Sequence, residues 1–254
     1  WEQYKPRFSN SWDEYRNSIW HRVGYVNWGY EAIGRFDSWE QIANYPVDND
    51  RKGNRTVVPG DIMYKDQNND GVINYLDERP IGYRVDSTPT LNFGINLSAS
   101  WKGFDLAMDW TGSGMTSWNQ CYETARPFQN DGNSPDEVLK DAWHLSDIWD
   151  ANSPLIPGKY PMVRLNTDET SAYDKSSYWL HNVTYLKLRN LEVGYTFPKT
   201  WLNRTGISNL RLFVSGTNLL TLSNLSVMDP ECASDNGLDY PPMRVINIGV
   251  NLKF

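Results

Sequence analysis

The feature that most constrains the fold is a strict alternation of apolar and polar residues in two long segments. From Leu91 to Trp101 every second residue is apolar, and the residues between are asparagine, glycine or serine. The same pattern ends the chain, from Ile246 to Phe254. Side chains point to opposite sides of a β-strand in turn, so this pattern predicts strands with one apolar and one polar face.

Three further segments extend this pattern to a predicted total of about five strands. Phe104 to Trp110 follows the tight-turn pair Lys102-Gly103, while 184–197 and 210–222 also have strand character. Lys187, Arg189 and Glu192 break the alternation of 184–197, which predicts a bulge or a polar partner on that face.

Composition and connection lengths favour a membrane barrel over a water-surrounded sheet. Aromatic residues make up 14% of the chain, and no run of eighteen apolar residues exists that could form a transmembrane helix. If the C-terminus is periplasmic, the short connections at 102–103 and 198–209 are also periplasmic. The long segments 112–183 and 223–243, and everything before Thr90, are then extracellular, as in outer-membrane barrels.

Five strands cannot close such a barrel, because single-chain barrels begin at about eight strands. An open sheet would leave unpaired backbone groups in lipid. The chain also starts WEQYKPRF, without a signal peptide. We therefore expect the remainder of the barrel to come from elsewhere in a longer or split polypeptide.

Several blocks of sequence resemble one known family. They read PGDIMYKDQNNDGVINYLDERPIG, STPTLNFGINLSASWKGFDLAMDWTGSGM, YLKLRNLEVGYTFPK, LRLFVSGTNLLTL and MDPE, followed by a glycine-containing last strand that ends in phenylalanine. In this order they resemble the C-terminal region of SusC/RagA-type TonB-dependent outer-membrane transporters of Bacteroidota. The likeness runs from Val23 to Phe254.

The resemblance implies an all-β fold, the C-terminal segment of a transmembrane antiparallel barrel that has 22 strands in the family. In this interpretation, residues 1–89 form an extracellular loop region that contains the loop 66–77, and residues 90–254 form about five barrel strands with extracellular loops. The family imports glycans or oligopeptides across the outer membrane with a SusD-type surface lipoprotein. The family's plug and the TonB box, which contacts the TonB complex, would lie on the part of the protein outside this sequence.

One loop has the spacing of an EF-hand calcium site. In DQNNDGVINYLD, which runs from Asp66 to Asp77, oxygen ligands fall at the EF-hand positions and Gly71 occupies the sharp turn. Aspartate replaces the usual glutamate at the last position, which shortens its reach. The alternative is an Asx-rich turn without an ion. The predicted ligands of a structural Ca²⁺ are Asp66, Asn68, Asp70, Val72 through its carbonyl, Asn74 and Asp77.

Aromatic residues gather in the predicted outer segments, where they could contact cargo or pack within loops. The sequence identifies no specific substrate residue. The two groups are Trp20, Tyr25, Trp28 and Tyr30, and Trp118, Tyr122, Trp143 and Trp149.

No pattern of a self-sufficient enzyme is present. Asp105 and Asp109 lie on one face of a predicted strand, where solvated barrel-interior residues are the better interpretation than an acid–base pair. The three histidines, His21, His144 and His181, have no metal-site or triad spacing. The net charge of −7 argues against nucleic acid as a partner.

Two further interpretations concern local structure. Cys121 and Cys232 form no CxxC motif, so unpaired thiols or a disulfide both remain open. The segment from Pro135 to Leu145 is the best helix candidate, with Ser134 as N-cap.

The alternative from a different class is a soluble, calcium-stabilised β-sandwich that binds glycans at the cell surface. Such a domain would dissolve without detergent, whereas a barrel segment would require it.

Overall fold

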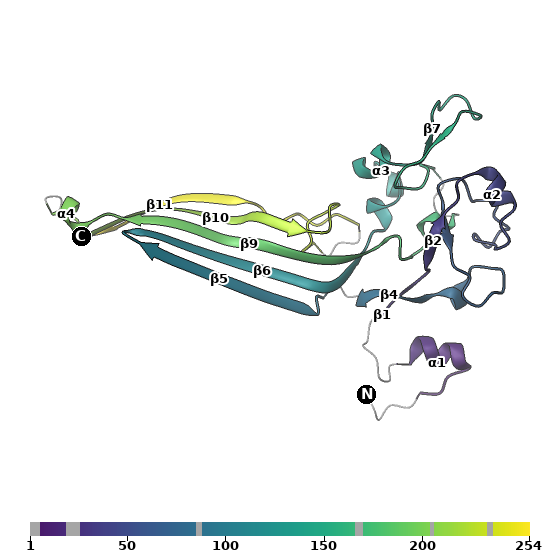
Figure 1. Ribbon diagram of the computed structural model, residues 1–254, viewed down its shortest axis with the longest axis horizontal. Helices are drawn as coiled ribbons and strands as arrows, with labels where there is room; N and C mark the ends of the chain where they lie inside the picture. The colour runs from purple at the N-terminus through teal and green to yellow at the C-terminus, as the bar shows by residue number, and fades with distance from the viewer. Residues whose placement is uncertain (1–5, 19–25, 85–87, 166–169, 204–205, 233–235) are drawn as a thin grey trace. The chain divides into compact units, whose positions relative to one another are not determined.

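The computed structural model (Figure 1) describes residues 6–18, 26–84, 88–165, 170–203, 206–232 and 236–254. The chain divides into two compact units. The first comprises 1–88, 117–182 and 234–238, and the second comprises 89–116, 183–233 and 239–254.

The second unit is built on one antiparallel sheet of five long strands. These are β5 (Leu91–Trp101), β6 (Phe104–Asn119), β9 (Leu180–Thr196), β10 (Asn209–Ser223) and β11 (Val245–Lys253), in the order β11-β10-β9-β6-β5. Figure 1 shows them side by side, with the short helix α4 (Lys199–Leu202) in the connection between β9 and β10. All the segments predicted as strands from their alternation are therefore strands, and β6 and β9 extend further than predicted.

The strand pairings give this sheet two chemically distinct faces. Val214 pairs with Val193 on one side and with Ile248 on the other, and all three point to what we call the apolar face. Ser215 pairs with Glu192 and with Asn247, which point to the opposite, polar face. The apolar side chains remain exposed within this chain: the exposed fraction is 83% for Ile248, 48% for Val214 and 45% for Val193.

No second sheet covers this apolar face among the described residues of the second unit, because the chain's other described sheets belong to the first unit. A β-sandwich requires two sheets that bury their apolar faces against each other. This arrangement does not support the sandwich alternative.

The broken alternation of β9 coincides with polar partners on its face, as predicted, and with an irregularity in its pairing with β10. Consecutive residues Arg189 and Asn190 bond to Thr111 and Asp109, which lie on one face of β6, so both reach the polar face. The pairing with β10 shifts register between Thr217 and Leu220. Asn218, with φ of +53°, occupies the shifted segment. The extra residue of this bulge lies in β10, because three steps from Thr217 to Leu220 match two steps along β9.

The connections differ in length at the two ends of the sheet. One end carries the two-residue turn Lys102-Gly103, with φ of +49° and +91°, and the α4 connection, joined by a bond from Thr196 N to Gly103 O of 2.8 Å. The opposite end carries the connections 120–179 and 224–244. The predicted loop 112–183 is thus shorter than expected, because β6 continues to Asn119 and β9 begins at Leu180.

The first unit consists of short elements around an aromatic core. Tyr64, Tyr160 and Trp179 have exposed fractions of 1% or less, and Ile62 and Ile73 are fully buried beside them. Its elements are α1 (Ser11–Asn17), β1 (Val26–Gly29), β2 (Ala32–Arg35), α2 (Trp39–Ala43), β3 (Ile62–Tyr64), η1 (Tyr75–Asp77), β4 (Arg79–Arg84), η2 (Tyr122–Thr124), η3 (Gln129–Asp131), α3 (Asp136–Lys140), β7 (His144–Leu145), β8 (Leu155–Ile156) and η4 (Ser171–Tyr173).

The helix predicted from Pro135 to Leu145 is shorter than expected. It covers only Asp136–Lys140, and Ser134 makes no cap because Pro135 occupies the N-cap position. The chain leaves the helix because Tyr160 N donates to Asp141 O and Trp143 N donates to Tyr160 O, both at 2.9 Å. Tertiary pairing therefore competes with the helix.

Among the described residues, the helices are too short and too polar to traverse a bilayer.

Candidate functional site

The predicted calcium loop lies between β3 and β4 in the first unit. Its three carboxylates, from Asp66, Asp70 and Asp77, each place an oxygen within 4.8 Å of the others. Carboxylate oxygens that meet in this way match the donor set that a hard cation such as Ca²⁺ prefers.

Backbone amides hold two of these carboxylates in place. Asp66 accepts from Asn69 N at 2.7 Å and from Gly71 N at 2.8 Å, while Asp70 accepts from Val72 N at 2.9 Å. These bonds lower the pKa of Asp70, with the bond from Val72 as the largest cause. The backbone bonds therefore fix the orientation of both carboxylates.

Asp77, the residue that replaces glutamate at the last EF-hand position, is fully buried. One of its oxygens accepts from Asn74 N at 2.8 Å and the other from Gln67 N at 2.8 Å. Asp77 thus joins both ends of the loop.

The oxygens of the other three predicted ligands all accept hydrogen bonds from within the loop. The Asn68 side-chain oxygen accepts from Asp70 N at 3.0 Å, and that of Asn74 accepts from Leu76 N at 2.9 Å. The carbonyl of Val72 accepts from the Asn74 amide at 3.1 Å. These contacts are those of an Asx turn, which is compatible with the loop both with and without an ion.

Neighbouring structure fixes the loop at its centre. Gly71 has φ of +83°, a conformation that glycine adopts without strain, and its carbonyl accepts from Asp48 N at 2.8 Å. Ile73 donates to Asp48 O at 2.9 Å, and its side chain is fully buried in the core. The loop is therefore attached to the folded unit on both sides of its sharp turn.

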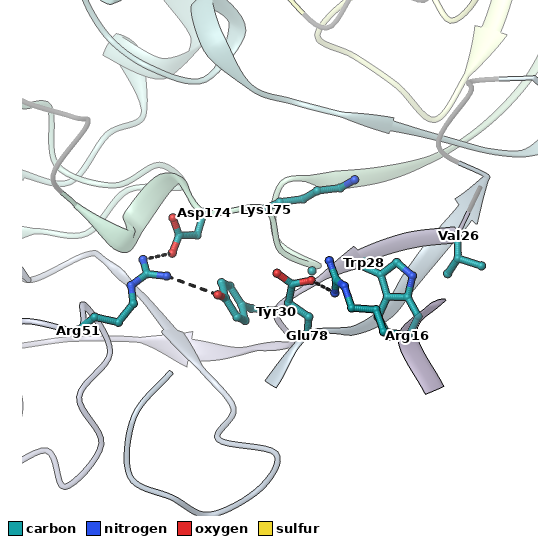
Figure 2. Close-up of a pocket in the computed structure, with 9 residues that line it drawn as sticks. Arg16, Val26, Trp28, Tyr30, Arg51, Glu78, Asp174 and Lys175 are labelled. Atoms are coloured by element: carbon teal, nitrogen blue, oxygen red, sulfur yellow. Dashed lines mark hydrogen bonds and ion pairs between the residues drawn. The ribbon is translucent and has the colours of Figure 1, made fainter. Parts of the chain in front are cut away.

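Two of the predicted aromatic residues, Trp28 and Tyr30, line a cavity of about 480 Å³ in the first unit (Figure 2). Arg51 lies between Asp174, at 2.7 Å, and the Tyr30 hydroxyl, at 3.4 Å, and Arg16 is paired with Glu78. The arginines of both pairs are thus neutralised by carboxylates.

Burial changes the acidity of two groups in this cavity. It raises the pKa of Tyr30 to about 12, and it raises the pKa of Asp174 despite the opposing charge of Arg51. The cavity lining is polar, and Lys175 is its third cationic residue beside the two arginine–carboxylate pairs.

The remaining predicted aromatic residues have diverse positions. Trp118 and Trp143 are buried at 3% and 6% exposed, whereas Tyr122 and Trp149 are 53% and 90% exposed. Trp20 and Tyr25, together with His21, lie outside the described residues. The aromatic residues therefore do not form one surface.

The two aspartates of β6 have different partners on the polar face. Asp105 is paired with Arg211, which also contacts Glu192 at 2.6 Å, and Asp109 accepts from the Asn190 amide at 3.3 Å. Each has its own partner, which fits interior residues of a barrel wall.

An ion-pair cluster on the same face was not identified from the sequence. The Lys187 ammonium, whose side chain is 1% exposed, lies 2.8 Å from Asp229 and 2.9 Å from Glu231. Arg189 is paired with Glu231. The motif MDPE, which contains Asp229 and Glu231, was the only sequence signal of this cluster. Lys187 lies about forty residues before these partners, so no local pattern links them.

The cysteines and the described histidines form no site. Among the described residues, neither Cys121 nor Cys232 forms a disulfide. His144 contacts the carbonyl of Ala142, and His181 contacts the side chain of Gln120, each at 2.9 Å. Among the described residues these are structural contacts within the first unit.

Comparison with known proteins places this geometry in a class. No protein-family model matches the chain. TonB-dependent receptor P3 of Formosa agariphila is 30% identical over 88% of this chain and 22% of its own length. TonB-dependent receptor SusC of Bacteroides thetaiotaomicron is 24% identical over 92% of this chain and 20% of its own length.

Solved structures agree on the fold. A structure of the RagAB peptide transporter is 21% identical, with a TM-score of 0.58 over 90% of this chain and 22% of that chain. The RagAB peptide importer in its closed-closed state gives a TM-score of 0.59 at 20% identity. The chain spans about a fifth of the length of the relatives that it matches.

The fold is thus that of a partial TonB-dependent transporter barrel, as the alternation and the resemblance predicted. Within that class, the chain is similar to SusC over most of its own length, and its structural neighbours include RagAB. These relatives are named receptors, and the solved neighbours are named transporters or importers.

Proposed function

We propose that this chain forms the C-terminal barrel segment and extracellular loops of a multi-pass outer-membrane importer that is driven through the TonB complex. The single observation that carries the proposal is the two-faced sheet, with exposed Ile248 and Val214 on one side and the paired charges of Arg211 on the other. Outer-membrane barrels present apolar residues to lipid and polar residues to the interior.

The strand edges support the same proposal. β5 pairs only with β6, and β11 pairs only with β10, so each leaves one edge without a partner strand among the described residues. Unpaired edges are strongly unfavourable in lipid. The remainder of the barrel supplies the missing strand partners and encloses the plug, on the same or a separate polypeptide.

The partners and cargo follow from the relatives. A SusD-type surface lipoprotein covers the long-connection end, and the cargo is a glycan or an oligopeptide; a relative named for peptide transport supports the latter. The TonB complex acts through a part of the protein outside this sequence.

Extraction of outer membranes in mild detergent, followed by mass spectrometry of every co-purifying chain, tests the proposal. We expect the chain to require detergent and to co-purify with barrel and plug sequence and with a lipoprotein. A chain that is soluble and alone without detergent would contradict the importer and favour the glycan-binding sandwich.

We also propose that the Asp66–Asp77 loop binds a structural Ca²⁺. The support is the convergence of three carboxylates and the attachment of the loop to the core through Asp48 and Ile73. The ion would neutralise the repulsion among Asp66, Asp70 and Asp77, and would order the loop without participating in transport.

Terbium luminescence tests this site, because Tb³⁺ replaces Ca²⁺ and Tyr75, within the loop and 62% exposed, can sensitise it. We expect a Tb³⁺ signal that Ca²⁺ displaces and that D66N/D70N abolishes. The matched control is D147N/D150N, which alters another aspartate-rich turn beside exposed Trp149. Equal loss in both variants would show nonspecific binding.

A further inference from the structure

The connection between β10 and β11 contains a short segment fixed to the polar face of the sheet. We call Met228–Cys232 the strap. It is held by Asp229 and Glu231, whose side chains are only 17% and 16% exposed although the segment has no helix or strand. Irregular segments that carry buried charges are unusual, so the contacts of these two residues need an explanation.

Lys187 of β9 provides that explanation. Its ammonium lies 2.8 Å from both oxygens of Asp229 and 2.9 Å from Glu231, and its side chain is 1% exposed. A buried ammonium is costly unless its donors are satisfied, and these three contacts satisfy all of them. Lys187 and the strap therefore depend on each other.

Arg189, two residues further along β9, extends the attachment. It pairs with Glu231, donates to the Thr111 hydroxyl at 3.1 Å and donates to Asn218 at 3.3 Å. Two cations of the strand thus face two carboxylates of the strap, and the cluster has no net charge.

The strap is also ordered internally. Glu231 N donates to the Asp229 carboxylate and Cys232 N donates to Asp229 O, each at 3.0 Å. A cavity of about 440 Å³ remains beside Glu231 and Arg189, lined also by polar-face residues such as Thr111 and Ser113. The strap therefore lies on the polar face of the sheet and leaves this cavity open beside it.

We propose that the strap is a fixed part of the wall on the polar face, and that the Lys187 ion-pair cluster is the device that holds it there. The contacts themselves are independent of the proposed importer. In the proposed importer, on which this consequence depends, the strap narrows the barrel interior beside the β10 bulge, and its release would widen that interior.

Cys232 is a native reporter of the strap, and Cys121, in the other unit, is an internal reference. The rate of alkylation by a neutral maleimide is measured at both cysteines by mass spectrometry. The sample is the full-length protein in isolated membranes or, if the protein is soluble, in buffer. In K187M we expect modification of Cys232 to accelerate at least about tenfold with Cys121 unchanged, because a buried ion pair that loses one partner no longer holds the segment closed.

The thiol chemistry makes an acceleration informative. Burial and the charges of Asp229 and Asp239 raise the pKa of the Cys232 thiol, and Lys187 opposes them. Removing Lys187 therefore lowers the thiolate fraction and slows the reaction of a closed strap. The matched control is K253M, an exposed lysine on the polar face of β11, for which no acceleration is expected.

A second variant keeps the proposal testable if K187M does not fold. D229N/E231Q leaves the strands unchanged, and hydrogen exchange at the amides of Glu231 and Cys232 reports the strap without dependence on thiol pKa. We expect faster exchange there alone. The proposal would be overturned if the Cys232 alkylation rate were unchanged in folded K187M. It would also be overturned if hydrogen exchange in D229N/E231Q were unchanged at the strap or rose equally across both units.

Discussion

The two units of this chain place their residues in opposite ways. In the first unit the large apolar side chains are inside, with Trp179 at 1% exposed and Ile62 fully buried. In the second unit Ile248 is 83% exposed, while Lys187 is among the most buried side chains. One polypeptide thus contains a unit with a buried apolar core, as expected for a region surrounded by water. It also contains a sheet whose exposed apolar face requires an apolar surrounding. The difference shows that exposure must be judged against the solvent of each region.

The largest expected effect comes from breaking the core of the first unit. Trp179 stacks with Tyr160 and Tyr173, at ring-centroid distances of 6.1 and 5.6 Å. W179A should destabilise this unit by about 3–5 kcal/mol, as truncation of a buried aromatic residue does. Hydrogen exchange should report opening of the first unit with the β10–β11 pairing retained. The control W149A, at a side chain that is 90% exposed, should have almost no effect.

A charge on the apolar face should break the second unit instead. Ile248 lies mid-strand, opposite Val214. I248R should cost about 2–4 kcal/mol if it faces the bilayer midplane, and should lower the amount of heat-modifiable barrel in outer membranes. Its neighbour Asn247 faces the polar side, so N247R should leave the barrel intact. Equal losses in both variants would contradict the assignment of faces.

Acid should affect the first unit through Asp50. Burial opposes ionisation, but bonds from Thr56 and Lys52 outweigh it and lower the pKa of Asp50 to about 2. A carboxyl whose folded pKa is depressed stabilises the fold above its unfolded pKa, and this stability is lost as the pH falls toward about 2.

The variant D50N should therefore remove about 2 kcal/mol at neutral pH, and the difference from the unsubstituted protein should shrink between roughly pH 4 and 2. Hydrogen exchange at 50–56, followed at several pH values, measures it. A difference that persists at the lowest pH would show that packing, and not charge, is responsible.

The smallest effect concerns a contact across the polar face. The ring of Phe213 lies over Gly249, its partner on β11, so closely that a Cβ at Gly249 would meet the ring at 2.2 Å. F213A should cost about 0.5–1 kcal/mol, the scale of a cross-strand pair. Chemical denaturation of the barrel in detergent should detect it against the control S215A on the same face.

The sequence predicted the strands well because each residue's side follows from local alternation. The segment predicted as a strand from Leu91 to Trp101 has the same bounds as β5. It predicted less where distant partners decide the structure. The helix after Pro135 ends early because Asp141 and Trp143 pair with Tyr160, and β6 continues to Asn119 through glycine and serine residues that show no alternation.

The same limit applies to the sites. The calcium loop is contiguous, so spacing alone brought Asp66, Asp70 and Asp77 together as a candidate, and the structure brings their carboxylates within reach of one another. The partners of Lys187 lie about forty residues away, in a segment whose carboxylates could have pointed to water. Only the folded chain shows that they do not.

The most direct test of the central claim is a spin-label scan of β11 in the full-length protein in outer membranes. Labels at successive positions from Ile246 to Asn251 are compared for accessibility to oxygen, which partitions into lipid, and to a water-soluble nickel complex. A lipid-facing β11 predicts a period of two, with oxygen favoured at Ile246, Ile248 and Val250 and nickel at the positions between. Uniform accessibility, or nickel access at Ile248, would contradict a sheet that faces lipid with its apolar side.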